Sequence, residues 1–594
     1  MKFFKTFLAC LLAIFVGSIF STIFSIFVFM GVVGALLWGG DSSVDLTPKP
    51  NSILHIDFSS SISDSPSQSL WDSFDINTMS VNTPITTYKA VQAIEAATYD
   101  PNIKGLFLDF PMDFSLSTNA IYELRMAIEE FRAVSGKFVI SYSDYYTQGQ
   151  YWLAAQSDVI YMNPYGAFEW SGMASQVLFY KNTLAKFGVE PEIFRHGRYK
   201  SAIEPFTLDR MSEDSRNQTQ ELLGSMWGRV VKDVAQDSGV DSTQLQEYAN
   251  TLELTQGRDA LRSGVVDSLA YRNGAVDYLA AMTQQENGKA VLVSLYDYAQ
   301  RTPTRNLSLP RVALLYADGE MYDQSMGEDR EIIGRDLAQQ IEKLRRDDQV
   351  KAVVVRVNSP GGSVMAADII YNQMVELRKV KPVVISMGDY AASGGYYISC
   401  MADEIIAAPT TITGSIGVFG MMFNIEKGAH DLLGLSMDVV KTNDMADIGN
   451  IFRAMTPAER HFMQSSVDST YVRFVGLVAQ GRGMSYQTAD DLAQGRVFSG
   501  VQALENGLVD GLGTLNDAIF AAARRANLAE GYLVDTYPKG SNGGFSEIIG
   551  AIGVRAKQLL VGSEAQDIAQ QEIKRLKSRC GVQAKIPWDL TINM

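Results

Sequence analysis

The sequence predicts an α/β protein with two tandem domains behind an N-terminal transmembrane helix. Three observations support this prediction: a long uncharged apolar run near the N-terminus, one pattern of strand-like and helical segments that occurs twice, and a proline-containing polar connector between the two copies. A chain of 594 residues is also too long for a single compact core. We expect a cytoplasmic start and anchor at residues 1–45, repeat domains at 46–300 and 301–540, and a tail at 541–594.

The predicted anchor is the stretch from residue 6 to residue 40, which contains no charged side chain. About 20 apolar helical residues cross a bilayer core of about 30 Å, so this run is long enough to span it. Lys2 and Lys5 precede the run, and Asp41 and Asp45 follow it, so the positive-inside rule predicts an extracytoplasmic body. A cleaved signal peptide is the alternative, although its apolar region is usually only about 7 to 15 residues long.

The composition narrows the classes of function. With 46% hydrophobic and 20% charged residues, neither wholesale disorder nor a polytopic membrane protein is expected. A formal net charge of −16 disfavours a nucleic-acid partner, which would require clustered basic residues. Only Cys10, Cys400 and Cys580 are present, so no disulfide framework is expected. No ligand spacing for a metal occurs, and we expect no cofactor.

The two copies can be matched segment by segment. Short apolar runs at residues 53–57 and 312–316 open the copies, and buried-strand patterns follow at 103–110 and 350–357. A helical stretch at 366–380 follows the last of these strands. Further positions match at one constant offset: Asp144 with Asp389, Tyr145 with Tyr390, Ser157 with Ala402, and Pro164 with Pro409. The alternation predicts an α/β layer with much parallel pairing in each copy, and the connector at 301–310 predicts their boundary.

The two copies differ in the residues that could perform chemistry. The second copy contains Ser393 and Ser415, whereas the first has Gln148 and Trp170 at the matching positions. Conversely, Lys200 in the first copy has Met445 near its approximate counterpart. These differences suggest a single site that takes one group from each copy.

Ser393 is the candidate nucleophile. It follows an apolar run at 383–387 and precedes a segment that could begin a helix, a turn that would expose its hydroxyl. The N–H of Gly394, together with that of the Gly361–Gly362 pair, would then cradle the oxyanion formed on a substrate carbonyl. The alternative is that both glycine-rich segments are only tight turns with close packing.

A serine hydroxyl needs a neighbouring base, and histidine is the usual one. Four histidines are present, none in a motif that connects it to the serine: His55, His196, His430 and His461. A lysine serves instead if burial or positive charge lowers its pKa. Lys200 has Arg195 and Arg198 close by, although Glu204 would act in the opposite direction if it faced the amine. Local sequence alone would make Lys200 an ordinary solvated surface lysine.

Four motifs together resemble the signal peptide peptidase A (protease IV) family in its long tandem form: residues 359–362 (Ser-Pro-Gly-Gly), 392–396 (Ala-Ser-Gly-Gly-Tyr), 413–417 (Thr-Gly-Ser-Ile-Gly) and 197–202 (Gly-Arg-Tyr-Lys-Ser-Ala). The resemblance covers nearly the whole chain. It implies a Ser-Lys dyad of Ser393 and Lys200, a serine at Ser415 that holds the amine, and an oxyanion donor at Gly394. It also implies two domains similar to Clp protease and crotonase.

The same resemblance implies a biological setting. Members of this family look like bowl-shaped tetramers on the outer, periplasmic face of the bacterial inner membrane, and they degrade cleaved signal peptides and other hydrophobic peptides. Two other functions stay open from the sequence. One is a crotonase-like acyl-thioester enzyme, which uses a similar oxyanion hole without a serine nucleophile. The other is a non-catalytic membrane scaffold that binds peptides or dimerises. A plausible helix at residues 564–578 in the tail carries no assigned chemistry.

Overall fold

The computed structural model describes residues 47–66, 74–75, 80–81, 84–285, 288–301, 308–327, 330–538 and 581–585, together with the isolated positions 17 and 21. The chain divides into two compact units, residues 1–49 and 50–594. Apart from positions 17 and 21, the anchor predicted at 6–40 lies outside the described residues, as does the tail helix predicted at 564–578. Within the described part, no helix combines the length and the apolar character needed to cross a bilayer. The sheets of the described chain all belong to the unit of residues 50–594.

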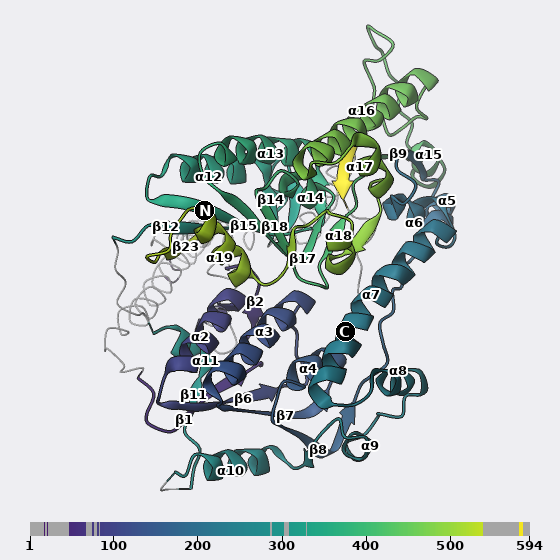
Figure 1. Cartoon of the computed structure of the whole chain (residues 1–594). Coiled ribbons are helices and arrows are strands. Elements are labelled where there is room, and N and C mark those ends of the chain that lie inside the picture. The colour runs from purple at the N-terminus through teal and green to yellow at the C-terminus, as the bar shows by residue number, and fades with distance from the viewer. Residues whose placement is uncertain are drawn as a thin grey trace, which may run out of the picture. The chain divides into compact units, whose positions relative to one another are not determined.

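The first half of this unit contains a six-stranded parallel sheet (Figure 1). Its strands, in spatial order, are β10 (Ser268–Leu269), β8 (Val159–Phe168), β7 (Phe138–Tyr146), β6 (Ile103–Phe110), β1 (Ser52–Asp57) and β11 (Leu292–Ser294). Apolar side chains are buried on both faces of the central strands, as expected of a parallel sheet covered on both sides. The predicted strand at 103–110 coincides with β6, and the prediction of parallel pairing is confirmed.

Helices cover both faces of this first sheet. α10 (Arg272–Met282) packs on one face through Ala275 and Leu279. The opposite face is covered by α2 (Thr87–Tyr99), α3 (Thr118–Ser135), α4 (Gln148–Ala154), α7 (Glu213–Ser238) and α11 (Leu295–Ala299). The remaining short elements are β2 (Ile62–Ser63), β3 (Phe74–Asp75), β4 (Ser80–Val81), β5 (Ile85–Thr86), α5 (Lys181–Lys186), η1 (Ser201–Ile203), α6 (Glu204–Thr207), α8 (Ser242–Thr251) and α9 (Gly257–Arg262).

The second half repeats this plan around an eight-stranded sheet. Its main path runs through β21 (Val497–Ser499), β19 (Ile412–Gly414), β17 (Val383–Ala392), β15 (Val350–Ser359), β12 (Arg311–Asp318) and β23 (Leu533–Tyr537), with β18 (Glu404–Ala407) and β22 (Gly511–Leu512) paired beside it. Only the β19–β21 pair is antiparallel among the described strands of this sheet. The predicted strands and α/β class are therefore confirmed in this half as well.

The helices of the second half also lie on two faces (Figure 1). One face is covered by α12 (Gly334–Arg346), α13 (Val364–Arg378), α14 (Gly394–Ser399) and α16 (Pro457–Arg482), and the other by α19 (Leu515–Arg525). α13 corresponds to the helix predicted at 366–380, shifted by two residues. α15 (Glu426–Leu433), α17 (Tyr486–Leu492) and α18 (Gly500–Glu505) complete this half.

A third sheet takes strands from both halves. Its order is β14 (Glu331–Ile333), β13 (Glu320–Tyr322), β16 (Gly361–Ser363), β24 (Gly581–Lys585), β20 (Val418–Asn424) and β9 (Glu190–His196). β9 comes from the first half and pairs antiparallel with β20 over seven residue pairs. This pairing fixes the segment that follows β9, which includes Lys200, against the second half.

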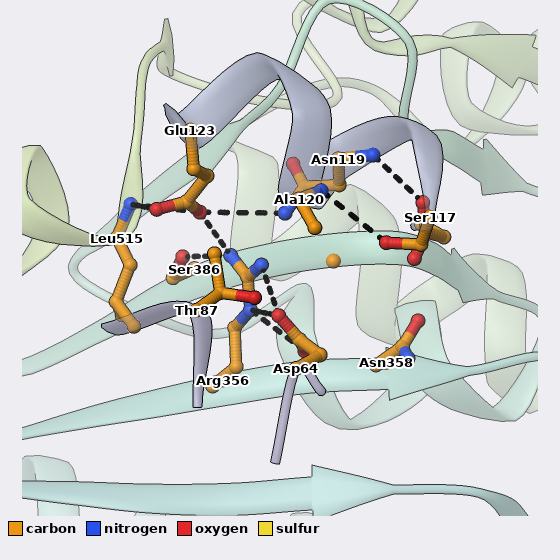
Figure 2. A network of polar contacts seen from close by, with 12 residues as sticks. Asp64, Thr87, Ser117, Asn119, Ala120, Glu123, Arg356, Asn358, Ser386 and Leu515 are labelled. Carbon is orange, nitrogen blue, oxygen red and sulfur yellow. Dashed lines mark hydrogen bonds and ion pairs between the residues drawn. The ribbon is translucent and has the colours of Figure 1, made fainter. Parts of the chain in front are cut away.

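A buried charge network also joins the two halves (Figure 2). Arg356 on β15 is buried and contacts Asp64 at 2.6 Å and Glu123 on α3 at 3.0 Å. Its guanidinium also donates to Ser386 Oγ at 2.8 Å, and Glu123 accepts the Leu515 N–H at 3.2 Å. Burial raises the pKa of Glu123. Because an unpaired charge is costly in the interior, this network stabilises only the arrangement in which both halves are in place.

Candidate active site

Lys200 and Ser393 are in contact although one comes from each half. Lys200 Nζ lies 2.8 Å from Ser393 Oγ, and both residues are fully buried. The same amine lies 3.0 Å from Ser415 Oγ and 3.1 Å from the Ser415 carbonyl oxygen. The structure therefore brings together the three side chains that the sequence singled out.

Ser393 is held in a strained turn between β17 and α14. Its φ of 54° and ψ of −111° lie outside the regions that non-glycine residues normally occupy, at a cost of about 1 to 3 kcal/mol. The Ser393 N–H donates to the Gly414 carbonyl at 2.8 Å, and its own carbonyl accepts the Tyr397 N–H in the first turn of α14. The predicted strand-to-helix turn is thus present.

The glycine pair predicted to hold an oxyanion follows the end of the neighbouring strand β15. β15 and β17 run parallel with Ser359 opposite Ala391, and Gly361 and Ser393 each follow two residues later. A methyl group on Gly395 would come within 2.7 Å of the Ser359 carbonyl oxygen, so α14 begins directly against this strand end. Gly361 and Gly362 have φ values of 100° and 147°, which other residues rarely adopt. This packing explains the need for glycine on both segments.

Burial lowers the pKa of Lys200 well below its ordinary value, and no charged neighbour contributes. The expected contribution of the nearby arginines is not found, because Arg198 is exposed and pairs with Asp214 at 2.7 Å. Glu204 does not face the amine either; it accepts hydrogen bonds from Ser212 N and Oγ. Removal of the amine from water therefore accounts for the shift in pKa.

Residues from both halves surround the segment that carries Lys200, and the sequence did not predict them. The Gln494 carbonyl accepts the Tyr199 N–H at 2.8 Å, and a methyl group on Gly495 would come within 2.7 Å of the Lys200 backbone nitrogen. Gln218 on α7 donates to the Tyr199 carbonyl at 3.1 Å and accepts the Val497 N–H at 3.4 Å. No local motif marks Gln218, Gln494 or Gly495, since each contacts a segment that lies elsewhere in the sequence.

The matching positions of the first half are filled by structural contacts. Gln148 Oε1 accepts the N–H groups of Ser171 and Gly172 at 2.8 and 2.6 Å. Trp170 is buried and donates to the Leu245 carbonyl at 2.8 Å. The first half therefore has hydrogen-bonded packing where the second has a serine site.

The histidines make other contacts. His55 binds Asp109 at 2.9 Å, His196 binds Asp468 at 2.7 Å, and His430 binds Asp431 at 2.9 Å. No hydrogen bond joins a histidine to Ser393 in the part of the chain that the structure describes. Within the same ranges, no three or more His, Cys, Asp or Glu side chains gather in a way that could hold a metal ion.

Comparison with known proteins gives consistent matches. The family model "Peptidase family S49" matches residues 131–286 and 375–529. The chain is 36% identical over 505 residues to Protease 4 of Haemophilus influenzae, which covers 82% of this chain and 81% of that protein. It is 38% identical over 462 residues to Protease 4 of Salmonella typhi, which covers 75% and 73%. A solved ClpP1 mutant from Listeria monocytogenes matches 35% of this chain and 94% of that chain, with a TM-score of 0.23 and 18% identity.

Proposed function

The chain belongs to peptidase family S49 and is a serine protease, and we propose that Ser393 is its nucleophile and Lys200 its general base. The observation that supports this most directly is the 2.8 Å contact between a serine hydroxyl and a lysine amine whose pKa is lowered by burial. A neutral amine has one lone pair and two hydrogens. It can accept the Ser393 proton while donating to the side chain and carbonyl of Ser415.

The reaction follows from this arrangement. Lys200 removes the hydroxyl proton while Ser393 Oγ attacks the substrate carbonyl carbon, and the N–H groups of Gly394 and of the Gly361–Gly362 pair hold the oxyanion. Lys200 then gives its proton to the leaving amine. Water, deprotonated by the same amine, releases the acyl group from the serine. Ser415 keeps the amine oriented throughout.

The substrates and the location are part of the same proposal. We propose that the protein cleaves hydrophobic peptides, signal peptides among them, and that residues 6–40 anchor it in the bacterial inner membrane with its body in the periplasm. The uncharged apolar run supports the anchor, and the likeness to the Protease 4 proteins supports the substrate class. A homotetramer of Clp protease-like and crotonase-like domains is the corresponding assembly.

The test is peptide hydrolysis by the purified full chain in detergent. Ser393→Ala and Lys200→Ala should each abolish hydrolysis of an apolar peptide, whereas Lys381→Ala should not. Lys381 serves as the control, because burial also lowers the pKa of its amine, although it is only partly buried, and this amine donates to the carbonyls of Leu344 and Asp347 instead of to a serine. Hydrolysis that persists in Lys200→Ala would exclude the lysine. A thioesterase or hydratase activity that survives Ser393→Ala would favour the acyl-thioester alternative.

A further inference from the structure

Residues 494–496 of the second half hold the backbone on both sides of the proposed base. The carbonyl of Gln494 accepts the Tyr199 N–H at 2.8 Å, directly before the lysine in the sequence. The carbonyl of Arg496 accepts the Ser415 N–H at 2.6 Å, and Ser415 is the residue that contacts the lysine amine. The position of this short segment therefore sets the position of the amine.

Gln494 has a backbone conformation that it would not keep unaided. Its φ is 55°, in the left-handed region that residues other than glycine rarely adopt. A methyl group on Gly197 would come within 2.7 Å of the Gln494 carbonyl, so this backbone also packs closely against the segment that carries Lys200. A strained conformation of this kind persists only where the surrounding structure holds it.

The phenol of Tyr471 holds Gln494 at two points. Tyr471 lies on α16, and only 1% of its surface is exposed. Its hydroxyl donates to Asp490 Oδ1 on α17 at 2.5 Å. The same hydroxyl accepts the backbone N–H of Gln494 at 3.3 Å and its side-chain amide N–H at 2.8 Å. These three hydrogen bonds use the proton and both lone pairs of the hydroxyl, so it has none left for substrate.

Tyr471 also contacts the strand that leads to Lys200. Its helix α16 packs against β9 (Figure 1), and the His196 ring at the end of β9 stacks on the phenol with ring centroids 3.9 Å apart. Gln494 Oε1 accepts the Arg198 N–H at 3.4 Å, two residues before the lysine. Tyr471 therefore reaches the segment that carries Lys200 both through β9 and through Gln494.

The charged groups around Tyr471 and the lysine segment are paired with one another. The phenol faces Asp490, and burial together with this carboxylate raises the pKa of Tyr471, so its hydroxyl stays protonated over the pH range of a peptide assay. For Lys200, burial is the cause of the lowered pKa. The ion pairs nearby are His196 with Asp468, Arg198 with Asp214, and Arg496 with Glu221.

We propose that Tyr471 is a positioning residue for the proposed base, which acts through Gln494 to keep the Lys200 amine against Ser393 and away from water. The proposal rests on the function assigned to Ser393 and Lys200 and adds a residue that maintains it. Without the hydroxyl, Gln494 relaxes toward an ordinary backbone angle, and the Tyr199 N–H loses its acceptor. Water then reaches the amine, and hydration favours its protonated form.

The experiment measures the pH profile of kcat/KM for an apolar peptide, with the full chain in detergent. Tyr471→Phe should move the midpoint of the profile up by about one pH unit or more, because full burial shifts an amine pKa by several units and partial hydration reverses part of that shift. Below the midpoint, kcat should fall about tenfold with KM unchanged, and the loss should be recovered at higher pH.

Tyr298→Phe is the matched control. Tyr298 is also a buried tyrosine whose hydroxyl donates to a carboxylate, Asp100 at 3.0 Å, but it lies in the first half on α11. Its loss should leave the midpoint where it is in the original chain. A fall in kcat/KM by the same factor at every pH in Tyr471→Phe would indicate a structural role alone and would overturn the proposal.

A pair of variants at position 490 gives the same test without changing the tyrosine. Asp490→Asn keeps an oxygen that accepts the Tyr471 hydroxyl, so its profile should match that of the original chain. Asp490→Ala removes this acceptor and should move the midpoint upward. Equal shifts in both variants would mean that the charge of Asp490 acts, not its hydrogen bond, and would contradict the proposed role of Tyr471. These variants decide the question if Tyr471→Phe does not fold, as judged by thermal unfolding.

Lys200→Ala in the same assay separates this proposal from the catalytic one. If Lys200→Ala is inactive while Tyr471→Phe and Asp490→Ala keep the original midpoint, the dyad stands and the role of Tyr471 is refuted. If hydrolysis persists in Lys200→Ala, the dyad is refuted, and the positioning role is refuted with it. An inactive Lys200→Ala together with the shifted midpoints would support both.

Discussion

Substitution of Gly495 by alanine should disable the proposed active site without contact with substrate. The new methyl group would lie within 2.7 Å of both the backbone nitrogen and the Cβ of Lys200. Ordinary contacts between such atoms begin near 3.4 Å, so one of the two segments must move by about 0.7 Å. A displacement of this size takes the amine from 2.8 Å to about 3.5 Å from Ser393 Oγ, the limit of a hydrogen bond.

We expect kcat to fall about 100-fold in Gly495→Ala, since a misplacement of about 1 Å has a cost of that order. The φ of Gly495 is 79°, so backbone strain adds a loss of stability of about 1 kcal/mol. Gly507→Ala is the matched control, because its φ is 72° and nothing lies within 4 Å of the added methyl group. Steady-state kinetics and thermal unfolding of both variants separate the two effects. Equal kcat in both variants would refute the idea that Gly495 positions the lysine.

Buried groups give three further predictions. At pH values between the lowered pKa of Lys200 in the folded chain and its ordinary pKa of 10.5, Lys200 is protonated only in the unfolded chain. Its contribution to stability therefore rises with pH across this range. Lys200→Met should remove this pH dependence and raise the melting temperature at neutral pH, as measured by calorimetry. Arg356→Met should lower the free energy of unfolding, measured in urea, by about 3 to 5 kcal/mol, because it leaves Asp64 and Glu123 buried without a cation. Unchanged stability would refute the role of this network in joining the halves. Gln148→Ser should leave the Ser393→Ala protein inactive in peptide hydrolysis, since no lysine amine hydrogen-bonds to Gln148 in the part of the chain that the structure describes; restored hydrolysis would contradict this.

The proposed mechanism also gives activity a pH dependence with a definite sign. Lys200 must be neutral to accept the Ser393 proton, so kcat/KM should rise with pH and level off once the amine has lost its proton. A profile that is flat from acid to alkaline pH would contradict the role of the amine.

The paired strands could be predicted because they carry local signals, since residues 103–110 and 350–357 are mostly apolar runs. Comparison of the two copies drew attention to Ser393, whereas Lys200 was identified by the resemblance of residues 197–202, with the other three motifs, to a known family. The environment of the lysine could not be predicted in the same way. The neighbouring arginines suggested an electrostatic contribution, yet in the structure Arg198 pairs with Asp214, and the residues packed against Lys200 include Gly417 and Gly495, more than 200 positions later in the chain.

β24 was missed for a different reason. Its sequence Gly-Val-Gln-Ala-Lys alternates apolar and polar residues over only four positions, the shortest run that indicates a half-buried strand, and glycine and alanine are depleted in strands. Its strand conformation depends on two edges that other segments provide, and the ion pair of Lys585 with Glu320 joins positions 265 residues apart. The buried ion pairs of Arg356 were not predicted either, because Arg356 is the one charged residue between Ala352 and Val357 and its partners Asp64 and Glu123 lie in the other half.

Division of the proposed dyad between the two halves makes the pKa of Lys200 a property of their interface. Lys200 has no charged partner that lowers its pKa, so the shift lasts only while the amine is kept from water. Much of the surface that excludes water belongs to the second half, where Gly417 lies close to the lysine stem and Gly495 close to its backbone. If the halves separated, the amine would be hydrated and protonated and would lose Ser393 at the same moment. The contacts that join the halves, such as Arg356 with Asp64, therefore preserve both the position of the base and its ability to accept a proton.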